Sequence, residues 1–523
     1  MFDVFHSSEN YFRVKILLIM KNTLLVFFLA LLFLNGCKSK SENQSSDKQN
    51  ISSESVADND TTNQIDDYLT DLSAKKHFSG GLLIIQNGEK IFSKGYGWAD
   101  QDKKIPFTTS TLASMGSITK LFTATAIMKL VEQGKIALDD PLKKFFPTVP
   151  NDKADITIHQ LLTHSSGFHE FLSGDEGDYE KIETEAFLQR AFDEPLSFEP
   201  GTKAIYTNVG MSIVAIIVEM ISGMDYETYL KQKLFVPIGI KHIGYQYPAE
   251  NDQIIAHGYQ NGIDRGTHQI DFENAGGGPY WNLKGNGGLQ ASLDEMLLWA
   301  NAFTNKTILS SASIQEMFNP QIEEEGTNGQ FQFGYGCNIF KSKRNTTVID
   351  NGGSNGIYFA RMLRFPQEGV VIYMVTNEST INTNMVLPNI TQLYFDGKIT
   401  MDAISAHSEF EFLKSKEVYE LINEKGVMDF EKSLKAAGIE IDNDMVLLEV
   451  GEKLSEENNT EAAIAVYLYY TKTFPNIVVA WNDLGDLYLL KKQTEEAKKC
   501  YEQALKIRPE NPRAKESLKN LPK

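Results

Sequence analysis

The stretch SITKLFTATAIMKLVEQ, which runs from Ser117 to Gln133, determines much of what this chain can be. Its apolar residues recur at helical spacing and Gly134 follows it, so the stretch predicts one long helix that ends at the glycine. The first four letters form an S-x-x-K tetrad, and residues three apart share a face of a helix. We therefore expect Lys120 beside the Ser117 hydroxyl, where an amine with a pKa lowered by desolvation can accept the hydroxyl proton.

The tetrad alone is a weak signal, because Ser45–Lys48 and Ser73–Lys76 match the same pattern in polar stretches. Two later patches strengthen the assignment. Tyr206-Thr207-Asn208 places a phenol and an amide close together, and the run DNGGSNG at residues 350–356 directly precedes an apolar segment.

Strand signals lie at both ends of this region. Asn87-Gly88 separates the apolar runs Gly81–Gln86 and Lys90–Gly97, which predicts a hairpin with a tight primed turn. Ile357–Phe365 and Val370–Thr376 predict a second strand pair. Helical and loop patterns fill the region between, so we expect one sheet built from both ends of the domain with a helical insertion.

The three chemical patches, in this order, resemble the serine β-lactamase and penicillin-binding-protein superfamily. The resemblance is to the class C β-lactamase-like branch, which also contains esterases and D-amino-acid peptidases. Ile156–Gly167 and Gly287-Gly288-Leu289 with Ser292 are similar to the same family, and the likeness covers residues 65–395. It implies an α/β (α+β) fold in which an antiparallel sheet is flanked by helices and carries a helical subdomain.

The resemblance also implies roles for single residues. Ser117 would be the acylated nucleophile, Lys120 its base or electrostatic partner, and Tyr206 the group that moves the proton to the leaving group. Substrate-binding positions would be Asn208, Asn351, Gly353 and Ser354, with the N–H groups of Ser117 and Ser354 forming the oxyanion hole. His159 and His164 are expected to be structural.

The third patch departs from the family pattern. The family has Lys-Thr-Gly or His-x-Gly there, whereas this chain has Asn351-Gly352-Gly353. An amide donates hydrogen bonds but carries no charge, so we expect a serine hydrolase for ester or amide substrates with weakened recognition of a carboxylate. Candidate substrates are D-amino-acid peptides, peptidoglycan-like stems, β-lactams and simple esters. The alternative is a catalytically degenerate envelope protein that binds peptides or proteins.

The N-terminus predicts a lipoprotein signal. Met20 begins a basic and then apolar run that ends in Leu34-Asn35-Gly36-Cys37, which resembles a bacterial lipobox with Cys37 as the lipidated residue. Residues 1–37 are therefore interpreted as a signal peptide with Met20 as the start, and residues 38–64 as a disordered tether. This places the protein in the cell envelope, anchored to a membrane and facing the periplasm or exterior. The alternative is a membrane anchor formed by Val14–Leu34.

The C-terminal part repeats with a period of 34 residues, a spacing typical of tetratricopeptide repeats. The recurring pairs are Gly451 and Gly485, Ala463 and Ala497, Tyr467 and Tyr501, and Pro475 and Pro509. We assign residues 396–415 to a linker and residues 416–523 to an all-α repeat region with a capping helix at its end. Such a surface predicts a protein or peptide partner.

Composition limits the partners further. The chain has 523 residues and a net charge of -19. This charge disfavours nucleic acid as a partner, because an acidic protein surface repels the phosphate backbone. Its three cysteines show no metal-ligand spacing, and no nucleotide-binding loop or haem signal is present. We expect no metal and no cofactor.

Overall fold

The computed structural model describes residues 59–173, 177–247, 253–260, 262–380, 383–399, 406–441, 444–509 and 511–521. The predicted signal peptide, Cys37 and most of the predicted tether lie outside these residues. The chain divides into two compact units, one covering Asn59–Glu457 and the other extending from Asn458 to the C-terminus. Helix α2 starts at Asn59, so the last residues assigned to the tether are helical.

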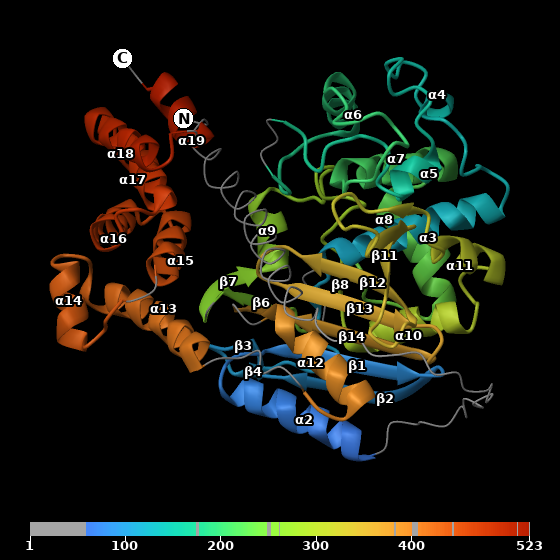
Figure 1. Cartoon of the computed structure of the whole chain (residues 1–523), viewed down its shortest axis with the longest axis horizontal. Coiled ribbons are helices and arrows are strands. Elements are labelled where there is room, and N and C mark those ends of the chain that lie inside the picture. The colour runs from blue at the N-terminus through green and yellow to red at the C-terminus, as the bar shows by residue number, and fades with distance from the viewer. Residues whose placement is uncertain are drawn as a thin grey trace, which may run out of the picture. The chain divides into compact units, whose positions relative to one another are not determined.

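The first unit is built on an eight-stranded sheet with the order β2-β1-β14-β13-β12-β11-β10-β9 (Figure 1). Neighbouring strands are antiparallel throughout. The strands are β1 (Gly80–Gln86), β2 (Glu89–Tyr96), β9 (Ile322–Glu323), β10 (Phe331–Gly334), β11 (Cys337–Lys341), β12 (Thr347–Ser354), β13 (Phe359–Phe365) and β14 (Val370–Thr376). Because β1 pairs with β14, the prediction of one sheet made from both ends of the domain is confirmed.

Asn87 and Gly88 join β1 to β2 with φ values of +50° and +84°, the left-handed pair that a primed hairpin turn requires. The predicted turn is thus present.

Helices cover both faces of the sheet, as expected for this fold class. On one face, α2 (Asn59–Ala74) and α12 (Thr383–Asp396) pack on apolar side chains such as Leu82, Ile372 and Leu363. The other face is covered by α3 (Thr119–Glu132), α10 (Leu293–Thr304) and the helical layer, where the larger core lies (Figure 1). The helical layer contains α4 (Leu142–Phe145), α5 (Ile158–Leu162), α6 (Thr184–Asp193), α7 (Asn208–Ser222), α8 (Tyr226–Tyr229), a π-helical turn (Leu230–Phe235), a 3-10 turn (Val236–Ile238) and α11 (Ser311–Met317).

The helix predicted for Ser117–Gln133 is present, but it begins two residues later than predicted. Gly116–Ile118 form the 3-10 turn η1, and α3 begins only at Thr119. Gly116 has φ +50°, and a Cβ there would lie 2.5 Å from the backbone nitrogen of Ser354. The tight turn is therefore imposed by the close approach of β12, which the local sequence does not encode.

Short strand pairs surround the main sheet. They are β3 (Trp98–Asp100) with β4 (Ile105–Pro106), β5 (Ala113–Ser114) with β8 (Gln290–Ala291), and β15 (Glu378–Ser379) with β6 (His257–Gln260) and β7 (Ile263–Thr267).

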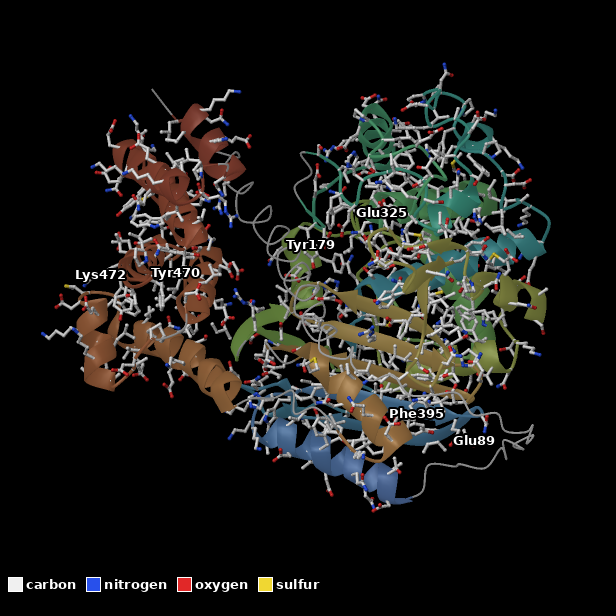
Figure 2. All side chains as sticks on the ribbon, in the orientation of Figure 1. Glu89, Tyr179, Glu325, Phe395, Tyr470 and Lys472 are labelled. Carbon is white, nitrogen blue, oxygen red and sulfur yellow. The ribbon has the colours of Figure 1, made fainter. Side chains whose placement is uncertain are left out.

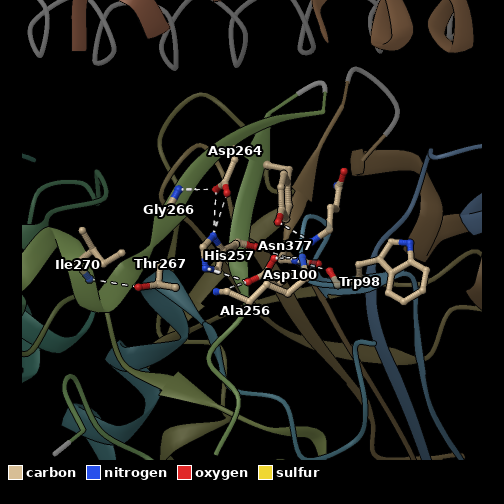
Figure 3. Close-up of polar contacts among 12 residues, drawn as sticks. Trp98, Asp100, Ala256, His257, Asp264, Gly266, Thr267, Ile270 and Asn377 are labelled. Carbon is tan, nitrogen blue, oxygen red and sulfur yellow. Dashed lines mark hydrogen bonds and ion pairs between the residues drawn. The ribbon is translucent and has the colours of Figure 1, made fainter. Parts of the chain in front are cut away.

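A polar cluster fixes β6 and β7 (Figure 3). His257 Nδ1 lies 3.0 Å from Asp264 Oδ2, and its Nε2 lies 3.6 Å from Asp100 Oδ2. The hydrogen bond with Asp264 raises the pKa of His257. Strand β7 leads into α9 (His268–Asn274), whose His268 Nε2 lies 3.1 Å from the Gly288 carbonyl oxygen. His268 thereby contacts the loop that contains Gly288.

The predicted repeat region is divided between the two units. Helices α13 (Ala406–Lys425), α14 (Phe430–Ala437) and α15 (Asp444–Glu456) belong to the unit that contains the sheet. The Arg265 side chain on β7 is buried and forms an ion pair with Glu456 on α15, so α15 is in contact with the unit that contains the sheet.

The second unit contains α16 (Thr460–Thr473), α17 (Val478–Leu490), α18 (Thr494–Ile507) and the terminal helix α19 (Pro512–Lys519). A Cβ on Gly485 would lie 2.6 Å from the Tyr501 ring, so α17 and α18 touch where the repeat pattern places a glycine. Arg513 on α19 lies 2.7 Å from Asp483 and also pairs with Asp486. The terminal helix is thus tied to α17, as a cap would be.

Within the described part of the chain, no single helix is long and apolar enough to cross a membrane. Only α7 together with Tyr226–Ile238, a pair bent by 72°, meets that length and composition criterion, and the apolar residues of α7 are largely buried in the core.

Candidate active site

Ser117 lies in η1, at the junction of the sheet and the helical layer, and its side chain is half-buried. Two hydrogen bonds position this turn. Met115 N–H donates to the Leu289 carbonyl at 2.8 Å, and Leu289 N–H donates to Thr119 Oγ1 at 3.1 Å. The Gly287-Gly288-Leu289 stretch, which had no assigned chemistry in the sequence, is therefore the support of the turn that carries Ser117.

The Lys120 amine is the centre of the site. It is 2% exposed, and its Nζ lies 3.0 Å from Ser117 Oγ, 2.7 Å from Asn208 Oδ1 and 2.6 Å from the Asn286 carbonyl oxygen. Burial lowers the pKa of Lys120 to about 7, although Glu170 and Asp178 oppose the shift. A neutral amine has two N–H groups, which the two carbonyl oxygens accept, and its lone pair then points to the Ser117 hydroxyl. The geometry is that of a general base.

Tyr206 lies on the other side of the nucleophile. Burial raises the pKa of its phenol, while a hydrogen bond with Ser117 acts in the opposite direction. Lys120 Nζ lies 4.6 Å from the centroid of the Tyr206 ring. The phenol therefore keeps its proton at neutral pH and is placed to donate it.

His164 packs on Tyr206, with the two ring centroids 4.8 Å apart. Its Nδ1 accepts a hydrogen bond from Thr207 N–H at 3.2 Å, and burial lowers the pKa of His164 to about 3. It is therefore a neutral residue that positions the Tyr206-Thr207-Asn208 segment. His159 is held by Tyr335, at 2.8 Å between Nδ1 and the hydroxyl. Both contacts support the structural roles expected for these histidines.

Strand β12 supplies a free backbone edge beside Ser117. Its pairing with β11 ends at Asp350 opposite Asn338, so residues 351–354 are unpaired on that side. Asn355 N–H donates toward β13, to the Tyr358 carbonyl, and the alternation of an antiparallel strand therefore turns the Ser354 N–H to the free edge. This supports the predicted oxyanion hole formed by the N–H groups of Ser117 and Ser354.

Gly353 makes this approach possible. A Cβ at Gly353 would lie 2.0 Å from the Met115 carbonyl oxygen and 2.6 Å from the Ser117 nitrogen. At the neighbouring Gly352, a Cβ would meet no atom within 4 Å. Only the first of these glycines is required by the contact between β12 and η1.

Asn351 does not occupy the position expected of it. The side chain is buried, and its Nδ2 donates to the Gly336 carbonyl oxygen at 2.7 Å. One N–H of the expected donor is thus bound within the protein, and the buried Oδ1 has no hydrogen-bond partner. The reason is the turn between β10 and β11, which brings Gly336 close to the Lys120 backbone.

Three features of the site were not foreseen. The first is the backbone carbonyl of Asn286, which binds the Lys120 amine. The second is the ion pair between Asp350 and Arg361, with contacts of 2.8 and 2.6 Å. The third is Glu324, which lies near Tyr206. A backbone carbonyl has no sequence signature. Asp350 is the first residue of the third patch, and that position is the one signal that could have drawn attention to it.

The contact at Gly353 yields a first prediction. Gly353→Ala should slow the covalent labelling of Ser117 by a fluorophosphonate about 100-fold or more, because displacing β12 removes an oxyanion-hole donor. Gly352→Ala serves as the matched control and should label at nearly the wild-type rate. Similar rates for both variants would show that the β12 contact does not organise the site.

The buried amine yields a second prediction. The labelling rate should rise with pH through about 7 and level off above it, because the neutral form of Lys120 accepts the Ser117 proton. Lys120→Arg, which stays charged, should react slowly at every pH. A wild-type rate that stays constant between pH 5.5 and 8.5 would exclude Lys120 as the base.

Comparisons with known proteins agree with this geometry. The beta-lactamase family model matches residues 65–392, and the tetratricopeptide repeat model matches residues 478–511. The putative penicillin-binding protein PbpX of Bacillus subtilis is 30% identical over 270 residues, covering 51% of this chain and 65% of that protein. Penicillin-binding protein 4* of the same organism is 24% identical over 318 residues, covering 59% and 70% respectively. The chain therefore spans about two thirds of the length of these two relatives.

Solved structures show the same fold. An octameric penicillin-binding protein homologue from Pyrococcus abyssi aligns with a TM-score of 0.55 and 25% identity, covering 69% of this chain and 81% of that one. D-amino acid amidase from Ochrobactrum anthropi, solved with L-phenylalanine amide, aligns with a TM-score of 0.55 and 20% identity, covering 64% and 99%. Because the family model covers 328 of the 523 residues, from 65 to 392, the chain belongs to the beta-lactamase family and carries a tetratricopeptide repeat toward its C-terminus.

Proposed function

We propose that this serine hydrolase cleaves esters or amides through an acyl-enzyme on Ser117. The observation that carries the proposal is the Lys120 amine, which is buried with two carbonyl acceptors and within 3.0 Å of the Ser117 hydroxyl. An arrangement that only stabilised the fold would not need a buried lysine without an ion pair.

The reaction follows from the geometry. Ser117 Oγ attacks the acyl carbon while its proton passes to Lys120 Nζ, and the N–H groups of Ser117 and Ser354 stabilise the oxyanion. When the bond to the leaving group breaks, Tyr206 gives that atom a proton and recovers one from Lys120. Water then attacks the ester on Ser117 while Lys120 accepts one of its protons, and Lys120 passes that proton to Ser117 Oγ as the acid product leaves.

The substrate class is proposed from the same residues. D-amino-acid peptides, peptidoglycan-like stems, β-lactams and simple esters all present an acyl carbonyl to Ser117. Since Asn351 carries no charge and its amide donor is bound to Gly336, substrates that depend on a carboxylate contact at this point should be poor. The alternative of a binding protein with a degenerate pocket draws on the same residue, and the labelling experiment below decides between the two.

The setting of the enzyme is also a proposal. Cys37 would carry lipid, and the residues between Cys37 and α2 would tether the hydrolase to a membrane of the cell envelope. The repeat from Val478 onward would bind a protein or peptide partner.

The catalytic proposal predicts that a fluorophosphonate probe labels the wild type and fails to label Ser117→Ala, since Ser117 is the nucleophile beside the Lys120 amine. Lys120→Ala and Tyr206→Phe should each lower ester turnover by several orders of magnitude, because residues that act as a unit fail together. Ser110→Ala, a change on the exposed surface, is the control. Unchanged labelling of Ser117→Ala would refute the assignment, and an unlabelled wild type would favour the binding protein.

The location proposal predicts that Cys37→Ser releases the protein from the membrane fraction and abolishes incorporation of radiolabelled palmitate. Ser39→Ala should behave like the wild type. If Cys37→Ser remains in the membrane fraction, the segment Val14–Leu34 is the anchor.

A further inference from the structure

Glu324 is placed beside the catalytic phenol by backbone contacts. It follows β9 and forms a parallel bridge with Ala204, two residues before Tyr206. The next residue, Glu325, donates its N–H to the Ala204 carbonyl at 2.9 Å, and Figure 2 labels this exposed residue in the region of the helical layer. Strand β9 therefore carries a carboxylate to the side of the site where Tyr206 lies.

The Glu324 side chain lies at the end of the free edge of β12. Its Oε2 accepts a hydrogen bond from Asn338 Nδ2 at 3.0 Å. Asn338 is the residue opposite Asp350, the position at which β11 stops pairing with β12. The Glu324 carboxylate thus lies beside the position at which the free edge of β12, residues 351–354, begins.

The charge of Glu324 is not balanced by the protein. The neighbouring Asp350 accepts both hydrogen bonds of the Arg361 guanidinium. In the part of the chain that the structure describes, no basic side chain forms an ion pair with Glu324. Its field nevertheless reaches the site, because Glu324 is one of the carboxylates that raise the pKa of Tyr206. Burial raises the pKa of Glu324 itself, as expected for a carboxylate without a cation.

The register of β11 and β12 shows which face of the sheet carries Glu324. Asn338 lies opposite Asp350, so the side chains of Asn338 and Asp350, and the Glu324 carboxylate bound to Asn338, lie on one face. Gly352 lies on the same face, and a Cβ there would meet no atom within 4 Å. The space between the free edge of β12 and Glu324 is therefore open on this face.

We propose that Glu324 selects substrates whose leaving group carries a positive charge. The leaving group is the relevant half of the substrate because Glu324 forms its backbone bridge with Ala204, two residues before Tyr206, which is the proton donor to that group. The inference rests on the proposed hydrolase function and names the substrate class for it. An ammonium group beside the scissile bond would find the carboxylate, whereas a carboxylate there would meet a like charge.

The experiment compares three acetate esters that share the acyl group. Acetylcholine has a cationic leaving group, 3,3-dimethylbutyl acetate is its neutral isostere, and the acetate ester of 3-hydroxypropanoate is anionic. The wild type should hydrolyse them in this order of kcat/KM, with about a fivefold preference for the cationic ester over the neutral one, the size expected of a half-exposed charge pair. In Glu324→Gln the ratio of cationic to neutral ester should fall to about one, whereas Glu325→Gln should keep the wild-type ratio.

The outcomes separate the two proposals. If the wild type hydrolyses the neutral ester and Ser117→Ala does not, the hydrolase proposal is supported. If the ratio of kcat/KM for the cationic ester to that for the neutral ester is then the same in the wild type and in Glu324→Gln, only the role of Glu324 is overturned. If no ester is turned over and Ser117 is not labelled, both proposals fail. If Glu324→Gln does not fold, the test is inhibition of the wild type. Choline must then inhibit more strongly than 3,3-dimethylbutanol, and this difference must disappear in 1 M salt. Equal inhibition would overturn the proposal.

Discussion

A lysine amine buried without a carboxylate partner is the constraint on which the arrangement of this domain depends. Desolvation of the charged form costs far more than two hydrogen bonds return, so the amine is held close to neutrality. The protein satisfies its N–H groups with Asn208 on α7 and with the carbonyl of Asn286. Three separate segments must therefore converge before Lys120 can be buried, and the same convergence assembles the reactive site.

The second half of the site depends on a contact between two backbones. Strand β12 approaches η1 so closely that neither Gly116 nor Gly353 can carry a side chain. Two N–H groups from distant parts of the chain thereby meet with no side chain involved. Such donors lose little conformational entropy when a substrate binds, because the sheet and the turn have already fixed them.

Much of this arrangement could be predicted from the sequence. The Asn-Gly turn, the sheet built from both ends and the meeting of Ser117, Lys120, Tyr206 and Asn208 each follow from a local pattern or from the family resemblance. The remaining features are tertiary. The 3-10 turn at Ser117 is imposed by β12, the amide of Asn351 is captured by a turn at Gly336, and Glu324 reaches Tyr206 through a backbone bridge to Ala204. Periodicity cannot reveal contacts that depend on how distant segments pack.

The ion pair between Arg265 and Glu456 has a consequence for how this protein can be divided. The Arg265 side chain is only 4% exposed, so a chain that stopped at the end of α12 would uncover this guanidinium and remove its carboxylate partner. Helices α13 to α15 therefore complete the surface of the sheet-containing unit, although the repeat pattern already begins on α15 with Gly451. One helix thus serves two purposes, since α15 supplies both the partner of Arg265 and the first helix of the 34-residue repeat. A shortened protein that ended before α13 would lose both.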